Sequence, residues 1–169
     1  FIRVKKVKNA QGDVYEYAHL VHGRWMKRKK NAKHKYKKII GRVHRFKDAD
    51  TGKFSGFVGN FDDFLQENKP KDIYKKLLEW KLISAGFTKH GSFVYLNNGI
   101  IVDLNRLIVH NGKRDVVAKV GGYAGYICSE TLEDLFSFEK LTEREEGKEL
   151  IKAIKRIGLK LDHNEFFLL

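Results

Sequence analysis

The stretch that decides the expected fold is residues 1–46, which read FIRVKKVKNAQGDVYEYAHLVHGRWMKRKKNAKHKYKKIIGRVHRF. Residues 1–8 and 14–21 are dense in β-branched and aromatic side chains, which favour strands. Between them, residues 9–13 (NAQGD) are of the types that tight turns require. Residues 35–46 repeat the composition of the strands. The stretch therefore predicts an antiparallel β-module of three strands.

A strongly basic segment, residues 23–34 (GRWMKRKKNAKH), separates the second expected strand from the third. Apart from Trp25 and Met26 it has little apolar content, and its like charges would repel one another in a compact helix. We therefore expect an extended loop that becomes ordered only on binding. In composition alone, residues 24–38 resemble the extensions by which ribosomal proteins thread between rRNA helices.

The net charge of the chain lies entirely in this module. Residues 1–46 contain fifteen Lys and Arg against two acids, Asp13 and Glu16, so their formal charge of +13 equals that of the whole chain. The remaining residues, 47–169, contain equal numbers of bases and acids. Segregated like charge destabilises a fold by self-repulsion unless a polyanion neutralises it. Release of the polyanion's counterions then favours binding, which indicates nucleic acid as the partner.

The first part of 47–169 predicts a connection and then a helix. Residues 47–69 have turn signals and four phenylalanines, so we expect an irregular segment that packs on the core. Residues 70–85 place apolar side chains at helical spacing. Pro70 suits the first turn of this helix, and Gly86 suits its carboxyl-terminal cap.

Strands and then helices follow. Residues 92–97 and 100–104 flank Asn98-Gly99, a strong hairpin signal. We expect a second hairpin from residues 107–110 and 115–120. Residues 121–128 are strand-like in composition, and a short helix is expected over 129–138. A second helix is expected over 142–157. It opens with the capping box Thr142-Glu143-Arg144-Glu145 and stops at Gly158.

The order of elements predicts the α+β class, because runs of strands and runs of helices are separated along the chain. We expect a basic antiparallel β-module at 1–46 and a charge-neutral α+β domain at 47–169, either as two units or as one continuous domain. The chain is 42% hydrophobic, which is enough to build a core.

Composition limits the other classes of protein. No window has the ~18 consecutive apolar residues of a membrane span, and the amino terminus lacks the apolar run of a signal peptide. The single cysteine, Cys128, excludes an internal disulfide framework. We therefore expect a soluble, cytoplasmic protein with no membrane partner. The scarcity of Gln, Cys and Met beside abundant charge is typical of thermophile proteins.

Catalytic signals are weak. The sequence contains no nucleotide-binding glycine loop and no nucleophile elbow. His19 and His22 lack the cysteine or acidic neighbours of a zinc site. A nuclease with a magnesium site is an alternative, and its candidate ligands are the four acids of the turn-rich stretch: Asp48, Asp50, Asp62 and Asp63. We favour a non-enzymatic protein that needs no cofactor, no metal and no small-molecule substrate.

The binding signals are stronger, because arginines form bidentate contacts with phosphate or guanine and lysines act as point charges on the backbone. Aromatic side chains within the charged segment can stack on unpaired bases. For Tyr15 and Tyr17, packing on the inner face of the sheet is an equal alternative. The expected contact residues are Arg3, Lys5, Lys6, Lys8, Arg24, Trp25, Lys27, Arg28, Lys29, Lys30, Lys33, Lys35, Lys37, Lys38, Arg42 and Arg45.

Residues 1–45 combine three features in order: a basic first strand, a tyrosine-containing second strand that ends in LV at 20–21, and a basic stretch that leads to IGR at 40–42. With this pattern, residues 1–45 resemble the opening segment of DDE-type insertion-sequence transposases, although His22 replaces the acid that usually follows LV. Such transposases are far longer, and residues 47–169 lack the layout of their catalytic core of three acids. The resemblance implies a nucleic-acid-binding β-module and does not imply transposition.

Three functions follow from the sequence. The first is a structural RNA-binding protein, associated with the ribosome and in contact with neighbouring ribosomal proteins. The second is a DNA-binding protein of transposase-derived or viral origin, in which the helix at 70–85 and the hairpin at 92–104 form a winged-helix-like pair. The third is the metal-dependent nuclease. We expect RNA to be preferred over DNA.

Overall fold

The structure is a computed structural model that describes residues 1–26, 30–49, 52–122, 124–138, 144–159 and 161. Within these ranges, the side chains of 24–26, 31–34 and 144–145 are not part of the description. Over the described residues the chain forms two four-stranded sheets and separate runs of helices. This arrangement is the α+β class that the order of elements predicts.

The first sheet, sheet A, contains the expected basic module. Its strands are β1 (Ile2–Lys8), β2 (Val14–Met26), β3 (Asn31–Phe46) and β8 (Val116–Val120), in the order β1-β2-β3-β8. The first three pair antiparallel, as predicted, whereas β8 pairs parallel to β3. The sheet therefore joins the basic module directly to a strand of the neutral part of the chain.

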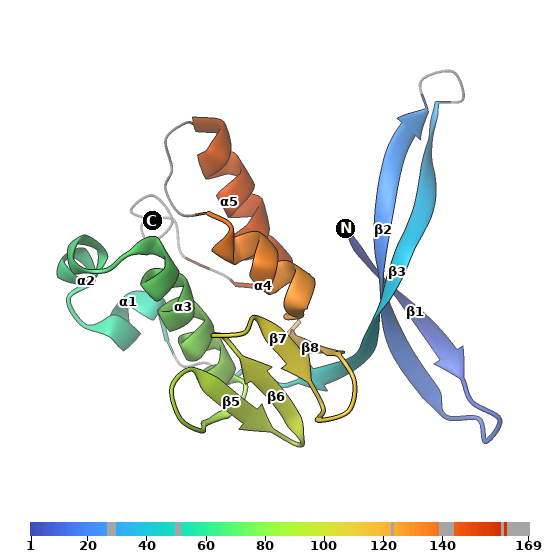
Figure 1. Cartoon of the computed structure of the whole chain (residues 1–169), viewed down its shortest axis with the longest axis horizontal. Coiled ribbons are helices and arrows are strands. Elements are labelled where there is room, and N and C mark those ends of the chain that lie inside the picture. Colours follow the sequence, from blue (N-terminus) through green and yellow to red (C-terminus); the bar gives the residue numbers. More distant parts are fainter. Residues whose placement is uncertain (27–29, 50–51, 123, 139–143, 160, 162–169) are drawn as a thin grey trace.

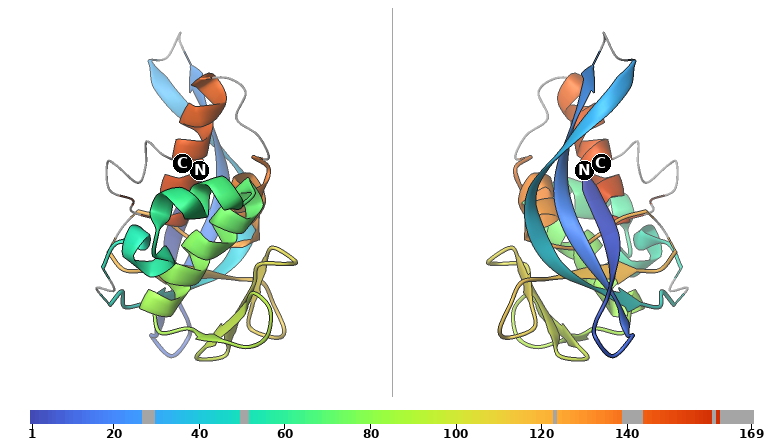
Figure 2. Two further views of the ribbon diagram at one scale, coloured as in Figure 1. Left: turned by 90° about the vertical axis from the view of Figure 1, so that its left-hand side faces the viewer. Right: turned by 90° about the vertical axis from the view of Figure 1, so that its right-hand side faces the viewer.

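The prediction of a loop at 23–34 is wrong for most of this segment. β2 continues to Met26 and β3 begins at Asn31, and the two strands pair from Gly23↔His34 to Met26↔Asn31. Each strand satisfies the backbone hydrogen bonds of the other, and this pairing does not depend on which side chains the two strands carry. Figures 1 and 2 show the result, a two-stranded arm that projects beyond the rest of the molecule.

The second sheet, sheet B, is the expected β-meander. It consists of β4 (Thr88–Lys89), β5 (Val94–Asn97), β6 (Ile100–Asp103) and β7 (Ile108–His110), which pair antiparallel in chain order. Asn98 and Gly99 between β5 and β6 both have positive φ, at 48° and 74°. These angles fit the two-residue turn that an Asn-Gly pair favours, because its twist matches that of the flanking strands.

The second expected hairpin is wrong. Only the bridge between His110 and Asp115 forms, after which β7 stays in sheet B while β8 joins β3 in sheet A. The reason is burial on both faces of β8. Val116 and Val117 point in opposite directions and are both buried, so β8 requires a core on each side. A strand of a solvent-facing hairpin would leave one of these side chains in water.

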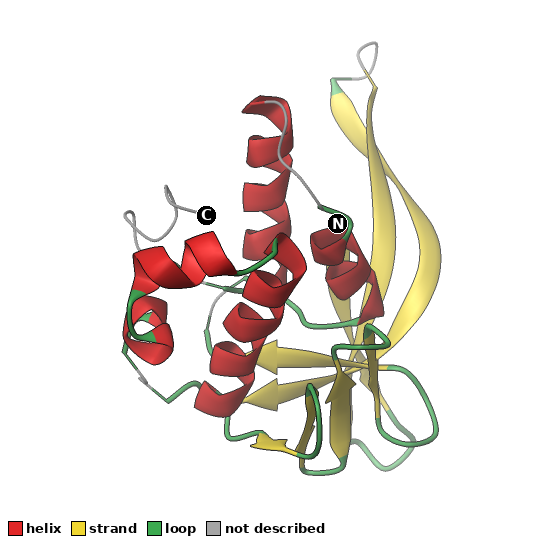
Figure 3. Cartoon of the chain, turned by 60° about the vertical axis from the view of Figure 1, so that its left-hand side comes forward, coloured by secondary structure: helices red, strands yellow, loops and turns green. Residues whose placement is uncertain are grey.

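Three longer helices cover the sheets. α3 (Pro70–Ser84) begins at Pro70 as predicted, and Gly86 after it has a φ of 78°. α4 (Ser129–Phe136) follows β8. α5 (Arg144–Ile157) ends just before Gly158, as predicted, and Gly158 has a φ of 85°. Thr142, the expected cap of α5, lies outside the described residues. Figure 3 shows these helices gathered to one side of sheet A.

The segment at 47–69 is more regular than predicted, because it contains α1 (Phe54–Val58) and α2 (Phe61–Glu67). The side chain of Asn60 caps α2 by accepting a hydrogen bond from the backbone N–H of Asp63. Asp62 and Asp63 in the first turn favour a helix, because carboxylates complement the positive end of its dipole. Phe54 is fully buried, and the rings of Phe61 and Phe64 contact it, which confirms that this segment packs on the core.

Two apolar clusters hold the elements together. The larger one lies between the helices, sheet B and one face of β8, and Leu77, Val102 and Leu135 are fully buried in it. The smaller one joins sheet A to the start of α4. Its buried members are Ala18, Ile40, Val43, Val117 and Cys128.

The seam between β3 and β8 requires a glycine at position 41. A Cβ atom there would lie 2.3 Å from the backbone oxygen of Asp115. We expect Gly41→Ala to lower the free energy of unfolding by roughly 1–3 kcal/mol, measured by urea denaturation, because two backbones would have to separate. Gly56→Ala is the matched control, since nothing lies within 4 Å of its Cβ position and α1 favours alanine. Equal losses in both variants would contradict this role of Gly41.

Candidate nucleic-acid interface

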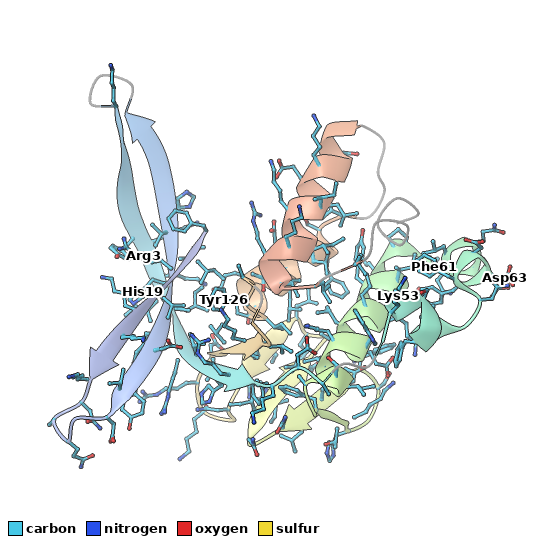
Figure 4. All side chains as sticks on the ribbon, turned by 180° about the vertical axis from the view of Figure 1, so that it is seen from behind. Arg3, His19, Lys53, Phe61, Asp63 and Tyr126 are labelled. Atoms are coloured by element: carbon cyan, nitrogen blue, oxygen red, sulfur yellow. The ribbon has the colours of Figure 1, made fainter. Side chains whose placement is uncertain are left out.

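The strand register sorts the side chains of β1, β2 and β3 onto two faces. The inner face packs against the start of α4 through Ile2, Val4, Ala18 and Leu20. We call the opposite side the outer face. The cross-strand pairs assign eight residues to it, and the contacts of Tyr36 with Lys5 and His19 add a ninth: Arg3, Lys5, Val7, Tyr15, Tyr17, His19, Ile39, Arg42 and Tyr36. In Figure 4, Arg3 and His19 lie on the side of the sheet away from the helices, and Tyr126 lies on the side toward them.

The outer face is basic and aromatic, and none of its nine residues is acidic. Arg3, Lys5 and Arg42 are exposed on it, and Tyr15, Tyr17 and His19 are half-buried. The main acid of the module, Glu16, pairs with Lys6 and so belongs to the inner side. None of the nine residues therefore compensates the three cations, and the other acid of the module, Asp13, meets this face at the hydroxyl of Tyr15, which donates to it at 3.5 Å.

Contacts between cations and rings order the outer face. The Nζ atom of Lys5 lies 4.1 Å from the ring centroid of Tyr36, and the ring of His19 meets that of Tyr36 edge-on at 5.5 Å. The guanidinium carbon of Arg42 lies 4.0 Å from the ring centroid of Tyr15. Such contacts hold long side chains in defined positions. The charges and ring planes of this face are thus arranged before any ligand arrives.

His19 contributes no charge to this face at neutral pH. Partial burial and the positive charge of Lys5 lower the pKa of His19 below its usual value. A lowered pKa keeps an imidazole neutral above that value, and the usual value is roughly 6.5. The positive charge of the outer face at neutral pH therefore comes from Arg3, Lys5 and Arg42.

Three residues of the outer face expose apolar surface among these charges. Ile39 is 66% exposed, Val7 is 47% exposed and Tyr36 is 42% exposed. A shallow pocket at Tyr36 is also lined by His22, Lys35 and Lys37. Exposed apolar side chains that gather on one face, unlike single ones, are typical of a surface that contacts another molecule.

Two of the predicted contact residues have carboxylate partners within the fold. Arg45 donates hydrogen bonds from Nε and Nη2 to the two carboxylate oxygens of Glu16, at 2.7 and 3.0 Å, and this pair lowers the pKa of Glu16. Lys38 pairs with Glu130 of α4 at 2.6 Å, and the hydrogen bond raises the pKa of Lys38. Both pairs lie on the inner side of sheet A, where they fasten the module to itself and to the body.

The other predicted contact residues divide by position. Arg3, Lys5 and Arg42 lie on the outer face, whereas Lys6 and Lys8 are exposed on the other side of the edge strand β1. Three more are exposed on the arm: Lys30, Lys35 and Lys37. Arg24, Trp25 and Lys33 belong to paired strands, but their side chains are not described. Lys27, Arg28 and Lys29 lie outside the described residues.

Ile39 and His19 are members of the outer face that the sequence analysis did not single out as contact residues, and strict alternation would not have found Ile39. Two β-bulges, at Ala18/His19 and at Leu20/Val21, shift the register between β2 and β3. Because a bulge inserts an extra residue, Arg42, Ile39 and Tyr36 share one face although they are three positions apart. Tyr15 and Tyr17 also lie on this face, not on the inner one.

The acids considered as magnesium ligands have local roles where the structure describes them. The carboxylate of Asp48 accepts hydrogen bonds from Lys81 at 2.5 Å and from Ser84 at 2.6 Å. Asp62 and Asp63 lie in the first turn of α2, and Asp50 is outside the described residues. Over the described part of the chain, no three His, Cys, Asp or Glu side chains gather in a way that could hold a metal ion.

The lysines of α3 are engaged with neighbouring side chains. Lys75 donates to the side-chain oxygen of Asn105 at 3.1 Å, and Lys76 pairs with Glu79 at 2.7 Å. Lys81 is buried against Asp48. These contacts leave α3 less suited to nucleic acid than the outer face, although β5 and β6 form the hairpin that a winged-helix-like pair requires.

Cys128 is a buried core residue. Burial raises the pKa of its thiol to about 12, so the thiol is protonated at neutral pH and is a poor nucleophile. No helix in the described ranges is both long and apolar enough to cross a membrane.

The pair between Arg45 and Glu16 predicts a pH dependence of stability. Because the folded state lowers the pKa of Glu16, its contribution is complete above the unfolded pKa of roughly 4.3 and is lost as the pH falls through the lower folded value. We expect Glu16→Gln to be less stable at pH 7 and to lose less stability on acidification, measured by urea unfolding at both pH values. Glu67→Gln, at the exposed end of α2, serves as the control. A Glu16→Gln profile parallel to that of the unmodified chain would show that the pair contributes nothing.

Comparison of the chain with known protein families, with curated proteins and with solved structures finds no match to any of them. Its function is therefore inferred from the geometry and chemistry of the outer face and the arm.

Proposed function

We propose that this chain is a non-enzymatic nucleic-acid-binding protein whose contact surface is the outer face of sheet A together with the β2–β3 arm. The observation that supports this most strongly is the segregation of charge in space. The whole formal excess of +13 belongs to residues 1–46, and none of the nine residues of the outer face is acidic. Contacts with phosphate would then supply most of the affinity, with little dependence on sequence.

The arm extends this surface beyond the body of the molecule. Lys35 and Lys37 are exposed on it, and its strands stay paired up to Met26 and Asn31. A paired ribbon holds its charges at fixed spacings, so that binding costs less conformational entropy than it would for a loop that must become ordered. The body, which has no net charge, serves as a scaffold or as a contact for a protein neighbour.

The first candidate ligand is structured RNA, and the protein would then be ribosomal or ribosome-associated. The supporting observation is that Tyr36 and Ile39 expose apolar surface on the sheet beside Arg42. Sequence-specific recognition of RNA uses loops and bulges whose bases stack on aromatic rings or on the planes of arginine side chains. A duplex without unpaired bases offers no such surface.

The second candidate is double-stranded DNA, and the shape of the arm supports it. The major groove of B-DNA is about 12 Å wide and admits a two-stranded β-ribbon, whereas the major groove of A-form RNA is too narrow for side chains to read. An unstructured basic loop at 23–34 would favour RNA over DNA, but β2 and β3 are paired over most of this segment. The loop therefore no longer supports RNA. This candidate keeps the transposase-derived or viral origin that the resemblance implies.

Binding through the arm predicts a change in salt dependence. We expect the triple variant Lys30→Gln, Lys35→Gln and Lys37→Gln to bind more weakly, and the slope of log affinity against log salt to fall by roughly 0.9 for each phosphate of a DNA duplex that the variant no longer neutralises. The melting temperature should hardly change, because these side chains are exposed. Filter binding or fluorescence anisotropy across a salt series measures both the affinity and the slope.

The matched control removes the same charge from the body by Lys69→Gln, Lys113→Gln and Lys155→Gln, all at exposed positions. We expect this control to bind almost as the unmodified chain does. Equal weakening in the two triple variants would show that affinity follows net charge alone and would contradict a contact surface on the arm.

Competition between ribosomal RNA and duplex DNA of equal length, across the same salt series, distinguishes the two candidates. Tighter and more salt-resistant binding to the RNA supports the ribosome-associated function. Equal or tighter binding to the duplex supports the DNA-binding function. Absence of binding to either would refute the proposed function.

A further inference from the structure

Two stacking positions lie on the outer face. At the first, the ring of Tyr36 is held by the Nζ atom of Lys5 at 4.1 Å and by the edge of His19 at 5.5 Å. At the second, the guanidinium of Arg42 lies over the ring of Tyr15, with its carbon 4.0 Å from the ring centroid. Tyr36 and Arg42 both belong to β3, and Ile39 lies between them on the same face.

Each position presents a polarised surface to the solvent. Tyr36 is 42% exposed, and Arg42 is exposed as well. Tyr15 covers one side of the Arg42 guanidinium, and the exposure of Arg42 lets a planar group reach the guanidinium from the solvent. Ile39 supplies apolar surface between the two positions, where a second planar group can rest out of water.

We propose that the outer face binds unpaired bases of a single-stranded nucleic acid, with Tyr36 and the Tyr15–Arg42 pair as its two stacking positions. This inference depends on the proposed function, because cations near the rings, Arg3 and Lys5 among them, must neutralise the phosphates that link the bases. It adds the class of ligand, a strand or loop whose bases are not paired. A base plane covers an aromatic ring or a guanidinium whatever the base, so the face would discriminate little between sequences.

Paired bases do not suit this face. In a duplex the flat sides of the bases are covered by their neighbours, and only the phosphates and the groove edges are open to a protein. A sheet surface with an isoleucine exposed at 66% would then meet water or phosphate, neither of which favours it. A single strand that lies across β3 brings base planes to Tyr36, Ile39 and Arg42 and keeps its phosphates near the lysines of the module.

A purely structural role for the same contacts is less consistent with their location. The contact of Lys5 with Tyr36 lies on the open surface of sheet A, while the buried contacts that fix the sheet to the body lie on the inner face. Stacking of bases accounts for the rings, the cations and the isoleucine together.

The test compares three fluorescein-labelled 12-mers with the full chain: single-stranded dT12, a strand of the same length and charge with abasic sites in place of the bases, and single-stranded U12. Phosphates are the same in the first two strands, so any difference between them comes from the bases. We expect dT12 to bind roughly tenfold more tightly than the abasic strand, which is the effect of about one stacked base. The affinity for U12 shows whether the ribose of RNA strengthens binding further. Stacking is judged from dT12 against the abasic strand, so it does not depend on which of U12 and dT12 binds more tightly.

A pair of matched variants locates the effect. Tyr36→Leu with Arg42→Lys keeps apolar bulk and charge but removes the two exposed planes, the ring of Tyr36 and the guanidinium of Arg42, and leaves the half-buried ring of Tyr15 in place. We expect this variant to lose most of the preference for dT12 over the abasic strand. The control, Phe57→Leu with Arg106→Lys, makes comparable chemical changes at exposed positions of the body and should keep the tenfold preference.

The outcomes separate this inference from the function on which it depends. If the unmodified chain binds dT12 and the abasic strand equally, base stacking is refuted while phosphate binding by the module stands. If it binds neither strand and also fails to bind duplex DNA and ribosomal RNA, the proposed function itself is refuted. If Tyr36→Leu with Arg42→Lys keeps the full preference for dT12 over the abasic strand, the assignment of the two positions is wrong. The comparison of the two strands with the unmodified chain stands even if that variant does not fold.

Discussion

The parallel pairing of β3 with β8 is the interaction on which the rest of the structure depends. β3 pairs with β2 from Asn31 to Arg42, and the far end of this pairing forms the arm, while the last five residues of β3, from Arg42 to Phe46, pair with β8. Gly41 makes the change of partner possible, because a side chain there would collide with the backbone at Asp115. One continuous strand thus fixes the basic module to the neutral body.

This attachment also determines which charges face the solvent. The inner side of sheet A packs against the start of α4, and two of its cations have carboxylate partners, Glu16 for Arg45 and Glu130 for Lys38. On the outer face Ile39 is 66% exposed, and none of the nine residues is acidic. The attachment therefore leaves cations without acids among the residues of the outer face, a local surplus of charge that attracts a polyanion.

Much of the fold could be predicted because its signals are local. The hairpin at Asn98-Gly99, the helix that opens at Pro70 and the glycine stop at position 158 each depend on a few neighbouring residues. The arm could not be predicted from charge, because backbone pairing satisfies hydrogen bonds whatever the side chains are. The separation of β7 from β8 could not be predicted from spacing, because it depends on the burial of Val116 and Val117 in two different clusters.

The sequence by itself determined the α+β class and the confinement of the net charge to residues 1–46, because composition and short-range spacing follow directly from the order of residues. Only the tertiary structure decided which of those basic residues share a face. Two bulges displace the register of β3, so that Arg42, Ile39 and Tyr36 come together at intervals of three. A bulge results from the pairing of two strands distant in sequence, and no pattern within one strand specifies it.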